Sequence, residues 1–454
     1  MNRKRRFVVL AAAALVLAAA WAAAPRWMGL PDYAGWRAAH RSSEAWLLDR
    51  HGEVLQSLRL DPRVRRLPLV ELDEISPVLV QAVVATEDHR YYGHHGVDWL
   101  AAGAALRDGL MGRGWRGAST ISMQLAAKLD PELAGTAPGS RRAGAKLRQV
   151  LAALVLERRW SKREILEAYL NGATYRGELA GIAAASRGLF GHAPATLQPA
   201  EAWLLAASLR APNASPARVA RRACRAGQLE PAACAELTSL AQSALAAPRA
   251  IPPDADAAPH LARRLLKLPG ERVRSTLDAS LQRAAQEVLS AQLDALGVRS
   301  VRDGAVLVVD NQSGDVLAYA GSAGRDSRAP AIDGVMARRQ AGSTLKPFLY
   351  ALAIESRLLT AASLVDDSPA GIDTGAGLYV PRNYDRRFRG TVSLRTALAS
   401  SLNVPAVRTV SIVGLPRLHA QLGRLGYAGL NPDPEFYGSS LALGSAEVTL
   451  AEQA

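Results

Sequence analysis

The chain has 454 residues, of which 49% are hydrophobic and 21% are charged, so it can bury large cores and is not a disordered protein. The length predicts about three domains. The net charge of +14 favours a polyanionic partner, such as nucleic acid, anionic lipid headgroups or a pyrophosphate-bearing substrate. The chain contains only two cysteines, Cys224 and Cys234, which excludes a disulfide-dense scaffold and a cysteine-rich zinc cluster.

The N-terminus combines a basic cluster at residues 3–6 with an apolar stretch from Phe7 to Ala24. As a helix, this stretch is about 27 Å long, close to the hydrocarbon thickness of a bilayer. Because basic residues stay on the cytoplasmic side, we expect a single-pass anchor that places the rest of the chain outside the cytoplasm. A cleaved signal peptide is the alternative, since the alanines at 22–24 resemble a processing site, but Pro25 disfavours cleavage.

Export of the chain changes what its charge and its cysteines predict. The positive charge then indicates a membrane surface as the binding partner and argues against nucleic acid, because the anchor places the chain outside the cytoplasm. Cys224 and Cys234 can form a disulfide in that compartment, and two free thiols in a loop region are the alternative.

Helical periodicity dominates from about residue 75 to about residue 210. It follows mixed residues that include a strand-like piece at 45–48. Apolar residues recur at helical spacing between Lys146 and Arg159. Ser161 and Glu164 then form a predicted capping box that opens a second helix, and capping alone explains both residues.

The residue composition and the hydrophobic pattern change after the helical part. Residues 213–275 are rich in Ala, Pro and Arg and predict a connector. Residues 277–296 predict an amphipathic helix. Two apolar runs, at 305–310 and 316–319, are separated by a polar turn and predict a β-hairpin that begins an α/β domain.

Acidic, histidine and aromatic residues are concentrated at residues 85–98. The histidines lack an i, i+4 pair with a third ligand, so these residues alone predict no protein-bound metal, and a polar helix end is the simpler structural interpretation. Downstream, small and hydroxyl residues at 117–124 can place hydrogen-bond donors near an anion.

In order along the chain, these segments resemble the five motifs of the peptidoglycan glycosyltransferase domain of class A, bifunctional penicillin-binding proteins. The fourth motif matches without a break from Ser161 to Asn171. The other matching positions are Glu87, Asp88, Tyr91 (in place of Phe), His94 and Gly96; Gly117, Ser119, Thr120 and Gln124; Lys146 and Glu157; and Arg210, Ala211, Pro212, Ser215 and Pro216.

The third motif departs from the family pattern at two positions, where Ala145 replaces an arginine and Gln149 replaces a glutamate. In the family, that glutamate is implicated in handling the donor or its pyrophosphate, and an amide cannot supply its charge. The Lys-Leu-Arg-Gln form is similar to the penicillin-binding protein 1C branch of the family. We therefore interpret Gln149 as a subgroup trait that nevertheless weakens the expectation of full activity.

The resemblance implies polymerisation of lipid II, a disaccharide-pentapeptide on undecaprenyl pyrophosphate, into β-1,4 glycan strands with inversion. It implies Glu87 as the general base, and Lys146 and Arg148, together with a divalent cation such as Mg or Mn, as the groups that neutralise the pyrophosphate. No organic cofactor is expected, and Glu157 is expected to hold a salt bridge. The implied substrate-binding residues are Asp88, His94, Ser119, Thr120, Gln124, Lys146, Arg148, Gln149 and Asn171.

Apolar and cationic residues are interspersed between the first two motifs. This mixture suits partial insertion into an anionic leaflet, and a buried helix face is the alternative. The residues are Leu106, Leu110, Met111 and Trp115 with Arg107, Arg113 and Arg116.

Ser343 and Lys346 form a Ser-x-x-Lys tetrad, in which one helical turn separates a hydroxyl from an amine that can activate it. The tetrad alone is weak evidence, and a helix N-cap is the alternative for Ser343. Ser401 and Asn403 follow as Ser-x-Asn, and the set resembles the N-terminal part of a penicillin-binding transpeptidase domain. The resemblance implies Ser343 as the acylated nucleophile, Lys346 as its base, Ser401 as a proton shuttle and Asn403 as a binder of the substrate's peptide carbonyl.

The third transpeptidase motif of the family, Lys-Thr/Ser-Gly, is not found before Ala454. In the family, this motif lines the active site and binds the substrate carboxylate. We expect either a fragment of a longer protein or a natural truncation with an inactive domain, and the stop inside a helical pattern favours the fragment.

The expected fold is an N-terminal transmembrane helix, a mainly α lysozyme-like glycosyltransferase domain and the N-terminal part of an α/β serine transpeptidase domain of the β-lactamase-like kind. The predicted boundaries are 1–26 for the basic tail and anchor, 27–60 for a linker, 61–235 for the glycosyltransferase domain, 236–300 for a connector and 301–454 for the incomplete transpeptidase domain.

The expected location is the bacterial inner membrane, with the N-terminus in the cytoplasm and the catalytic domains in the periplasm or outside the cell. Expected partners are lipid II, nascent glycan strands, membrane lipids, cell-wall synthesis proteins and, if the second domain is complete, β-lactams at Ser343. A non-catalytic scaffold or β-lactam-binding subunit is the alternative, and it is supported only by Gln149 and the missing Lys-Thr-Gly.

Overall fold

The computed structural model describes residues 29–111, 119–130, 142–296, 301–324, 327–369, 371–373 and 378–454. The chain folds into two units. Unit 1 comprises Met1–Trp46, Ser57–Asp254 and Leu266–Arg272, and unit 2 comprises Leu47–Gln56, Ala255–Leu265 and Val273–Ala454.

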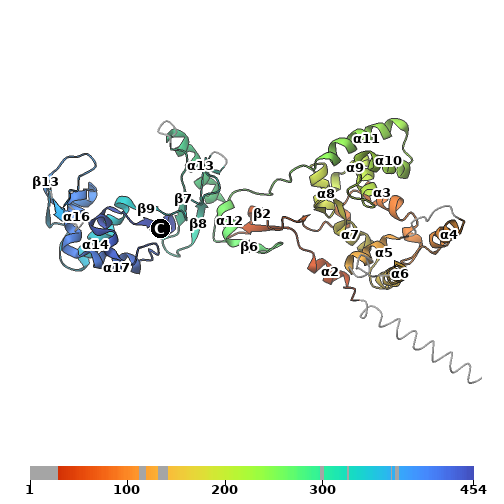
Figure 1. The fold of residues 1–454 in the computed structure, drawn as a ribbon, viewed down its shortest axis with the longest axis horizontal. Coiled ribbons are helices and arrows are strands. Elements are labelled where there is room, and N and C mark those ends of the chain that lie inside the picture. The colour runs from red at the N-terminus through yellow and green to blue at the C-terminus, as the bar shows by residue number, and fades with distance from the viewer. Residues whose placement is uncertain are drawn as a thin grey trace, which may run out of the picture. The chain divides into compact units, whose positions relative to one another are not determined.

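Unit 1 is mostly helical, as predicted (Figure 1). A small sheet has the order β3-β5-β4, in which β3 runs parallel and β4 antiparallel to β5. The elements are α2 (Tyr33–Ala39), β3 (Arg65–Arg66), η1 (Leu72–Glu74), α3 (Pro77–Glu87), η2 (Tyr91–Gly93), α4 (Trp99–Leu110), α5 (Ile121–Leu129), α6 (Arg142–Arg159), α7 (Lys162–Gly172), β4 (Thr174–Arg176), β5 (Leu179–Ala180), α8 (Ile182–Leu189), η4 (Pro194–Thr196), α9 (Pro199–Ser208), α10 (Pro216–Gly227) and α11 (Pro231–Ala246).

The starts of the helices in unit 1 follow from local sequence chemistry. Helices α3, α9, α10 and α11 begin with proline, whose fixed φ and missing N–H suit the first helical position. Thr120 caps α5 by accepting a hydrogen bond from the backbone N–H of Met123. The predicted capping box of Ser161 and Glu164 at the start of α7 is confirmed.

The structure differs from the prediction of a connector over residues 213–275. Helices α10 and α11 lie within this range and bury Val219, Ala223, Leu237 and Leu245 in the hydrophobic core of unit 1. Alanine and arginine, which dominate the composition, are strong helix formers, and the prolines occupy helix starts and not helix interiors. The composition was therefore compatible with packed helices.

The core of unit 1 forms where α3, α5, α7 and α9 meet. Leu79 and Val83 of α3, Leu125 of α5 and Leu205 of α9 are all buried there. Helix α5 packs against both α6 and α7, and α3 packs against α9. Helices α3 and α5 thereby contribute to one hydrophobic core.

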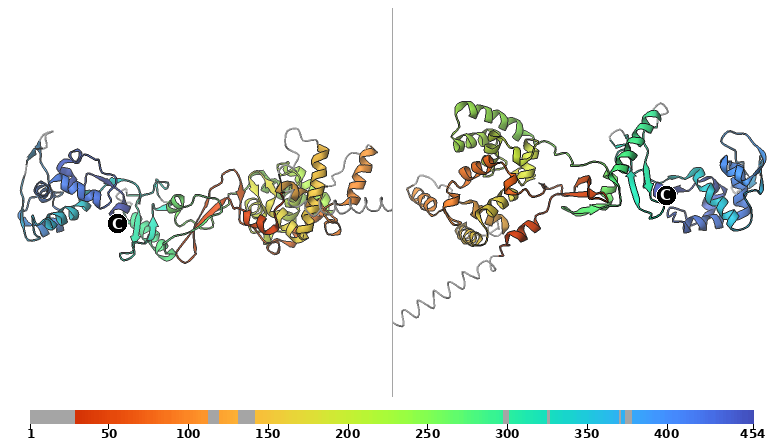
Figure 2. Two further views of the ribbon diagram at one scale, coloured as in Figure 1. Left: turned by 90° about the horizontal axis from the view of Figure 1, so that it is seen from below. Right: turned by 180° about the vertical axis from the view of Figure 1, so that it is seen from behind.

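Unit 2 contains both helices and short antiparallel sheets. The predicted helix over 277–296 and the predicted hairpin are confirmed as α13 and the β7–β8 pair, which packs against α13 (Figure 2). The elements are α12 (Pro259–Leu265), α13 (Ala279–Leu296), β7 (Val306–Val309), β8 (Val316–Ala320), β9 (Arg339–Gln340), η7 (Gly342–Leu345), α14 (Lys346–Glu355), β10 (Leu364–Asp367), β11 (Ile372–Asp373), β12 (Leu378–Tyr379), β13 (Gly390–Ser393), α15 (Leu394–Ala399), α16 (Asn403–Val413), α17 (Leu415–Arg424), η8 (Pro434–Phe436), η9 (Gly438–Leu443), β14 (Glu447–Val448) and α18 (Leu450–Gln453).

A second hydrophobic core is built around α14 and α16 in unit 2. Leu349 of α14, Val410 of α16 and Leu441 of η9 are buried in it. Strand β10 pairs antiparallel with β13, with Leu364 opposite Ser393.

A further sheet has the strand order β2-β1-β6. Its strands are β1 (Glu44–Leu48), β2 (Val54–Arg59) and β6 (Arg272–Arg274), and β1 includes the predicted strand-like piece.

Within the described ranges, none of the helices has the length and apolar character needed to cross a bilayer. The predicted anchor at residues 7–24 lies outside these ranges.

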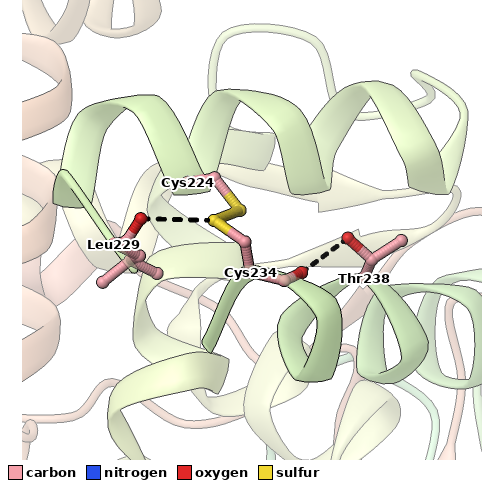
Figure 3. Close-up of a disulfide and its surroundings, with 4 residues drawn as sticks. All are labelled: Cys224, Leu229, Cys234 and Thr238. Atoms are coloured by element: carbon pink, nitrogen blue, oxygen red, sulfur yellow. Dashed lines mark hydrogen bonds between the residues drawn. A yellow bond between two sulfur atoms is a disulfide. The ribbon is translucent and has the colours of Figure 1, made fainter. Parts of the chain in front are cut away.

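The two cysteines form a disulfide, which settles the alternative that the sequence leaves open (Figure 3). The bond joins Cys224 of α10 to Cys234 of α11, and the Cα atoms are 5.6 Å apart. It closes a loop with a sequence separation of 10 residues and ties two helices that also pack against each other. The loop between the helices is short, so the bond restricts a small part of the unfolded chain.

Reducing this disulfide is expected to lower the free energy of unfolding of unit 1 by about 2–3 kcal/mol, because loop closure no longer limits the unfolded chain. Chemical denaturation with and without reductant measures the difference. The double variant with Cys224→Ser and Cys234→Ser should have the free energy of unfolding of the reduced protein, and adding reductant should not change it. Equal denaturation midpoints for the oxidised and reduced protein would contradict the prediction.

Candidate active sites

Glu87 is the last residue of α3, and its side chain is 1% exposed. Gln124 on α5 donates a hydrogen bond of 2.9 Å from Nε2 to Oε2 of this carboxylate. The other oxygen, Oε1, accepts no hydrogen bond from any described residue and lies 3.8 Å from Nε of Arg210. A buried carboxylate oxygen without a hydrogen bond is costly, so the arrangement indicates an acceptor reserved for a ligand.

Tyr169 of α7 fixes the orientation of the Gln124 amide. Its hydroxyl donates a hydrogen bond of 3.0 Å to Oε1 of Gln124, which turns the amide NH₂ group toward Glu87. Burial, and then the nearby charge of Glu87, raises the pKa of Tyr169 well above its ordinary value, so the hydroxyl stays protonated and can donate. Tyr169 lies inside the fourth predicted motif, but sequence reasoning gave it no role.

Asp88 is engaged by the protein itself. Nε2 of His94 lies 3.0 Å from Oδ1 and 3.1 Å from Oδ2 of Asp88, and the backbone N–H of Ile121 donates to Oδ2 at 3.1 Å. Both side chains are nearly buried. Asp88 and His94 thus join the loop after α3 to the start of α5, and this position gives them a structural role beside Glu87.

Two other predicted substrate-binding residues also make internal contacts. The Thr120 hydroxyl donates to the carbonyl of Gly96 at 2.6 Å, in addition to capping α5. Asn171 makes two hydrogen bonds with the backbone of Val70. Its Nδ2 donates to the Val70 carbonyl at 2.8 Å, and its Oδ1 accepts from the Val70 N–H at 3.0 Å. Direct contact of Thr120 and Asn171 with substrate stays a prediction.

Polar and cationic side chains meet where α6 passes the start of α5. Nζ of Lys146 donates to Oγ of Ser119 at 2.5 Å and to Oε1 of Gln149 at 3.4 Å. Burial lowers the pKa of Lys146 from its ordinary value of 10.5. Arg148, on the same helix, is exposed. The structure thus joins Lys146 to Ser119, which precedes α5, and to Gln149 on its own helix, but it shows no hydrogen bond of Arg148 to any of these described side chains.

Glu157 forms the salt bridge that the sequence predicts. Its Oε1 lies 2.8 Å from Nζ of Lys162, and the hydroxyl of Ser122 also donates to it. Because the Glu157 side chain is nearly buried, this pairing explains the carboxylate without a chemical role.

In unit 2, Lys346 is fully buried at the start of α14. Its Nζ donates to the backbone carbonyl of Ser401 at 2.6 Å, to Oγ of Ser401 at 3.2 Å and to Oδ1 of Asn403 at 2.7 Å. Burial lowers the pKa of Lys346 from 10.5 to about 8. The structure therefore joins three of the four predicted residues of this site directly.

Ser343, the fourth predicted residue, is exposed in η7, three residues before Lys346. No hydrogen bond of its hydroxyl is found within the described part of the chain. The backbone before Ser343 is held by the segment after η9, because N–H of Gly342 donates to the carbonyl of Gly444 at 3.0 Å. A Cβ at Gly444 would lie 1.9 Å from the Gly342 carbonyl oxygen, so only glycine permits this approach.

A buried network behind Ser401 and Asn403 was not anticipated from the sequence. Oδ1 of Asn383 accepts a hydrogen bond of 2.8 Å from the backbone N–H of Asn403. Nδ2 of Asn383 donates to both oxygens of Asp367, at 2.8 and 2.9 Å. Asp367 is fully buried and also accepts from the backbone N–H of Arg389 at 2.9 Å. Asp367 and Asn383 thus position Asn403, which in turn contacts Lys346.

Replacing Asn383 with Ala is expected to slow acylation of Ser343 by about tenfold, because a small displacement of Asn403 misplaces the lysine that it orients. The pH dependence of acylation should also shift, since Oδ1 of Asn403 accepts a hydrogen bond from Lys346. Asn431→Ala, elsewhere in unit 2, serves as the control and should change neither quantity. An unchanged rate and pH profile in a folded Asn383→Ala protein would contradict the positioning role.

Comparison with known proteins adds an independent observation. The Transglycosylase family model matches residues 51–230, and the Penicillin binding protein transpeptidase domain model matches residues 304–438. Penicillin-binding protein 1C of Escherichia coli K12 is 37% identical over 399 residues, which cover 85% of this chain and 50% of that protein. The biosynthetic peptidoglycan transglycosylase of Rhodospirillum centenum is 44% identical over 146 residues, which cover 32% of this chain and 60% of that protein.

A solved structure shares the fold. The crystal structure of penicillin-binding protein 1A from Haemophilus influenzae matches with a TM-score of 0.50 at 18% identity, and the match covers 91% of this chain and 67% of that chain. The chain spans about half the length of the E. coli relative.

Proposed function

Because the chain belongs to the class A penicillin-binding proteins, we propose that unit 1 polymerises lipid II into β-1,4 glycan strands and releases undecaprenyl pyrophosphate. The observation that carries the proposal is the carboxylate of Glu87. It is buried, oriented by Gln124 through one oxygen, and left with a second oxygen that accepts no hydrogen bond from the described residues.

The reaction needs a base because a sugar hydroxyl is a poor nucleophile. In the proposed step, Oε1 of Glu87 removes the proton from the 4-hydroxyl of the acceptor sugar as its oxygen attacks the anomeric carbon of the growing chain. The bond from that carbon to the pyrophosphate oxygen breaks on the opposite face, so the configuration inverts. Lys146 and Arg148 stabilise the negative charge that accumulates on the departing pyrophosphate.

For unit 2 we propose acyl transfer at Ser343, the activity of a D,D-transpeptidase and the target of β-lactams. Lys346 in its neutral form accepts the proton of the Ser343 hydroxyl as Oγ attacks the peptide carbonyl. Ser401 passes a proton to the departing amine, and Asn403 holds the peptide carbonyl of the substrate. The shared hydrogen bonds of Lys346, Ser401 and Asn403 support these roles.

We further propose that unit 1 acts at the surface of the bacterial inner membrane, held by the N-terminal segment at 7–24. Support comes from α4 and the residue after it, where Trp99, Leu100 and Met111 are 64%, 73% and 58% exposed. Large apolar side chains in this state suit contact with lipid. Trp115 lies outside the described residues, as do Arg113 and Arg116.

Incubating the chain with lipid II in vesicles tests the function of unit 1. The expected products are glycan strands that lysozyme digests, with one undecaprenyl pyrophosphate released for each disaccharide added. A folded protein that yields no strands, yet is acylated by a β-lactam, would instead support the alternative of a non-catalytic, β-lactam-binding subunit.

A further inference from the structure

The side chains around Glu87 bear on the divalent cation that the family resemblance implies. Proteins hold Mg²⁺ and Mn²⁺ with oxygen ligands, commonly one or two carboxylates together with substrate phosphates. Among the residues that the structure describes, no group of three or more His, Cys, Asp and Glu side chains is placed to hold a metal ion. The carboxylates of the first motif are Glu87 and Asp88, so the fit depends on what their oxygens contact.

Both carboxylates already face cationic or N–H groups of the protein. Oε2 of Glu87 accepts a hydrogen bond from Gln124, and Oε1 lies 3.8 Å from the guanidinium of Arg210. Both oxygens of Asp88 lie within 3.1 Å of Nε2 of His94, and the N–H of Ile121 also donates to one of them. A cation bound to Oε1 of Glu87 would therefore be repelled by the guanidinium of Arg210, and one bound to Asp88 would have to break the junction between the α3 loop and α5.

The position where the family pattern has its second glutamate carries Gln149, one helical turn after Lys146. Its Oε1 accepts a hydrogen bond of 3.4 Å from Nζ of Lys146, which also donates to Ser119. An amide oxygen satisfies an ammonium donor without neutralising its charge, whereas a carboxylate would cancel it. The site thus keeps a fixed positive charge beside Gln149, and this charge repels a divalent cation.

We propose that this glycosyltransferase site binds no divalent cation through its protein side chains, so that the ammonium of Lys146, held by Ser119 and Gln149, stabilises the departing pyrophosphate without a metal. The inference rests on the proposed function of unit 1 and deepens it. The step balances with residues of the chain alone: the acceptor proton moves to Glu87, and the electron pair of the broken C–O bond leaves on the pyrophosphate oxygen.

Titration of the full chain with Mn²⁺ in the absence of lipid II, followed by electron paramagnetic resonance, tests binding directly. Wild type is expected to show no saturable Mn²⁺ site, and Glu87→Gln should give the same titration. Polymerisation by wild type should also stay within about twofold after treatment with a chelator, since no protein-bound metal takes part in stabilising the leaving group. A saturable Mn²⁺ site that Glu87→Gln removes would overturn the proposal, and so would a loss of polymerisation that Mg²⁺ or Mn²⁺ restores.

Variants of Lys146 test the positive half of the proposal. Lys146→Met is expected to lose about a hundredfold or more in polymerisation rate, added Mg²⁺ should not restore it, and Lys146→Arg should recover part of it. Restoration of Lys146→Met by Mg²⁺ would show that a metal can take over the role and would contradict the proposal. If wild type forms no glycan under any condition, the proposed function fails, while the Mn²⁺ titration still decides whether the site binds a cation.

Discussion

Replacing Glu87 with glutamine is expected to slow lipid II polymerisation by about a hundredfold to ten-thousandfold, the usual contribution of a positioned general base. Glutamine has nearly the same shape, but an amide cannot take the proton of the acceptor hydroxyl. Quantifying glycan strands over time at saturating lipid II measures the effect. Because the substitution is nearly isosteric, the protein should remain folded.

Glu178→Gln provides a matched control in the same unit. Glu178 is exposed and pairs with Arg59 at 2.7 Å, so losing its charge should leave the polymerisation rate within about twofold of wild type. Equal rates for wild type and Glu87→Gln would exclude Glu87 as the base, whatever the control does.

Acylation of Ser343 by a β-lactam is expected to depend steeply on pH. A neutral amine is needed to accept the serine proton, and burial lowers the pKa of Lys346 to about 8. Below pH 8 the neutral fraction falls about tenfold for each unit, so the acylation rate should rise with pH and level off above about 8. An unperturbed lysine would keep the rate rising to well above pH 10.

The same shift affects stability, and its sign can be worked out. The pKa of Lys346 is lower in the folded protein than in the unfolded chain, so the unfolded chain holds the extra proton between about pH 8 and 10.5. The free energy of unfolding therefore rises with pH in that window.

Labelling with a fluorescent penicillin across the pH range measures the rate of Ser343 acylation, with Ser343→Ala as the unlabelled control. A rate that is flat around pH 8 would contradict the assignment of Lys346 as the base.

The motifs grouped residues that the structure brings together around Glu87, but they did not give the division of labour among them. Motif membership brought Glu87 and Gln124 together, and the structure joins them through a hydrogen bond. The same criterion also selected Asp88 and Thr120, whose side chains the structure engages within the protein. A motif shows that positions belong together, whereas the choice between substrate contact and internal support depends on side-chain direction, which is set by packing.

Long-range contacts account for most of what the sequence did not predict. Asn383 accepts a hydrogen bond from Asn403 and donates one to Asp367, although many residues separate the three along the chain. Neither Asp367 nor Asn383 belongs to a motif recognised in the sequence. Tyr169 orients Gln124 from another helix, at a sequence separation of 45 residues. In contrast, the features that hydropathy and capping patterns alone predicted correctly are local, such as the capping box at Ser161 and the β7–β8 hairpin. The connector was mispredicted because tertiary packing decides whether an alanine-rich segment forms stable helices.

The affinity of Glu87→Gln for lipid II, measured by titration in vesicles beside its rate of turnover, is the most direct test that Glu87 moves a proton and does not merely hold the substrate. If a base acts only in the transition state, replacing it leaves the affinity for substrate within about twofold of wild type while the rate of turnover falls sharply. We expect that result. If the variant loses affinity as much as it loses rate, then Glu87 serves binding or folding and is not the general base.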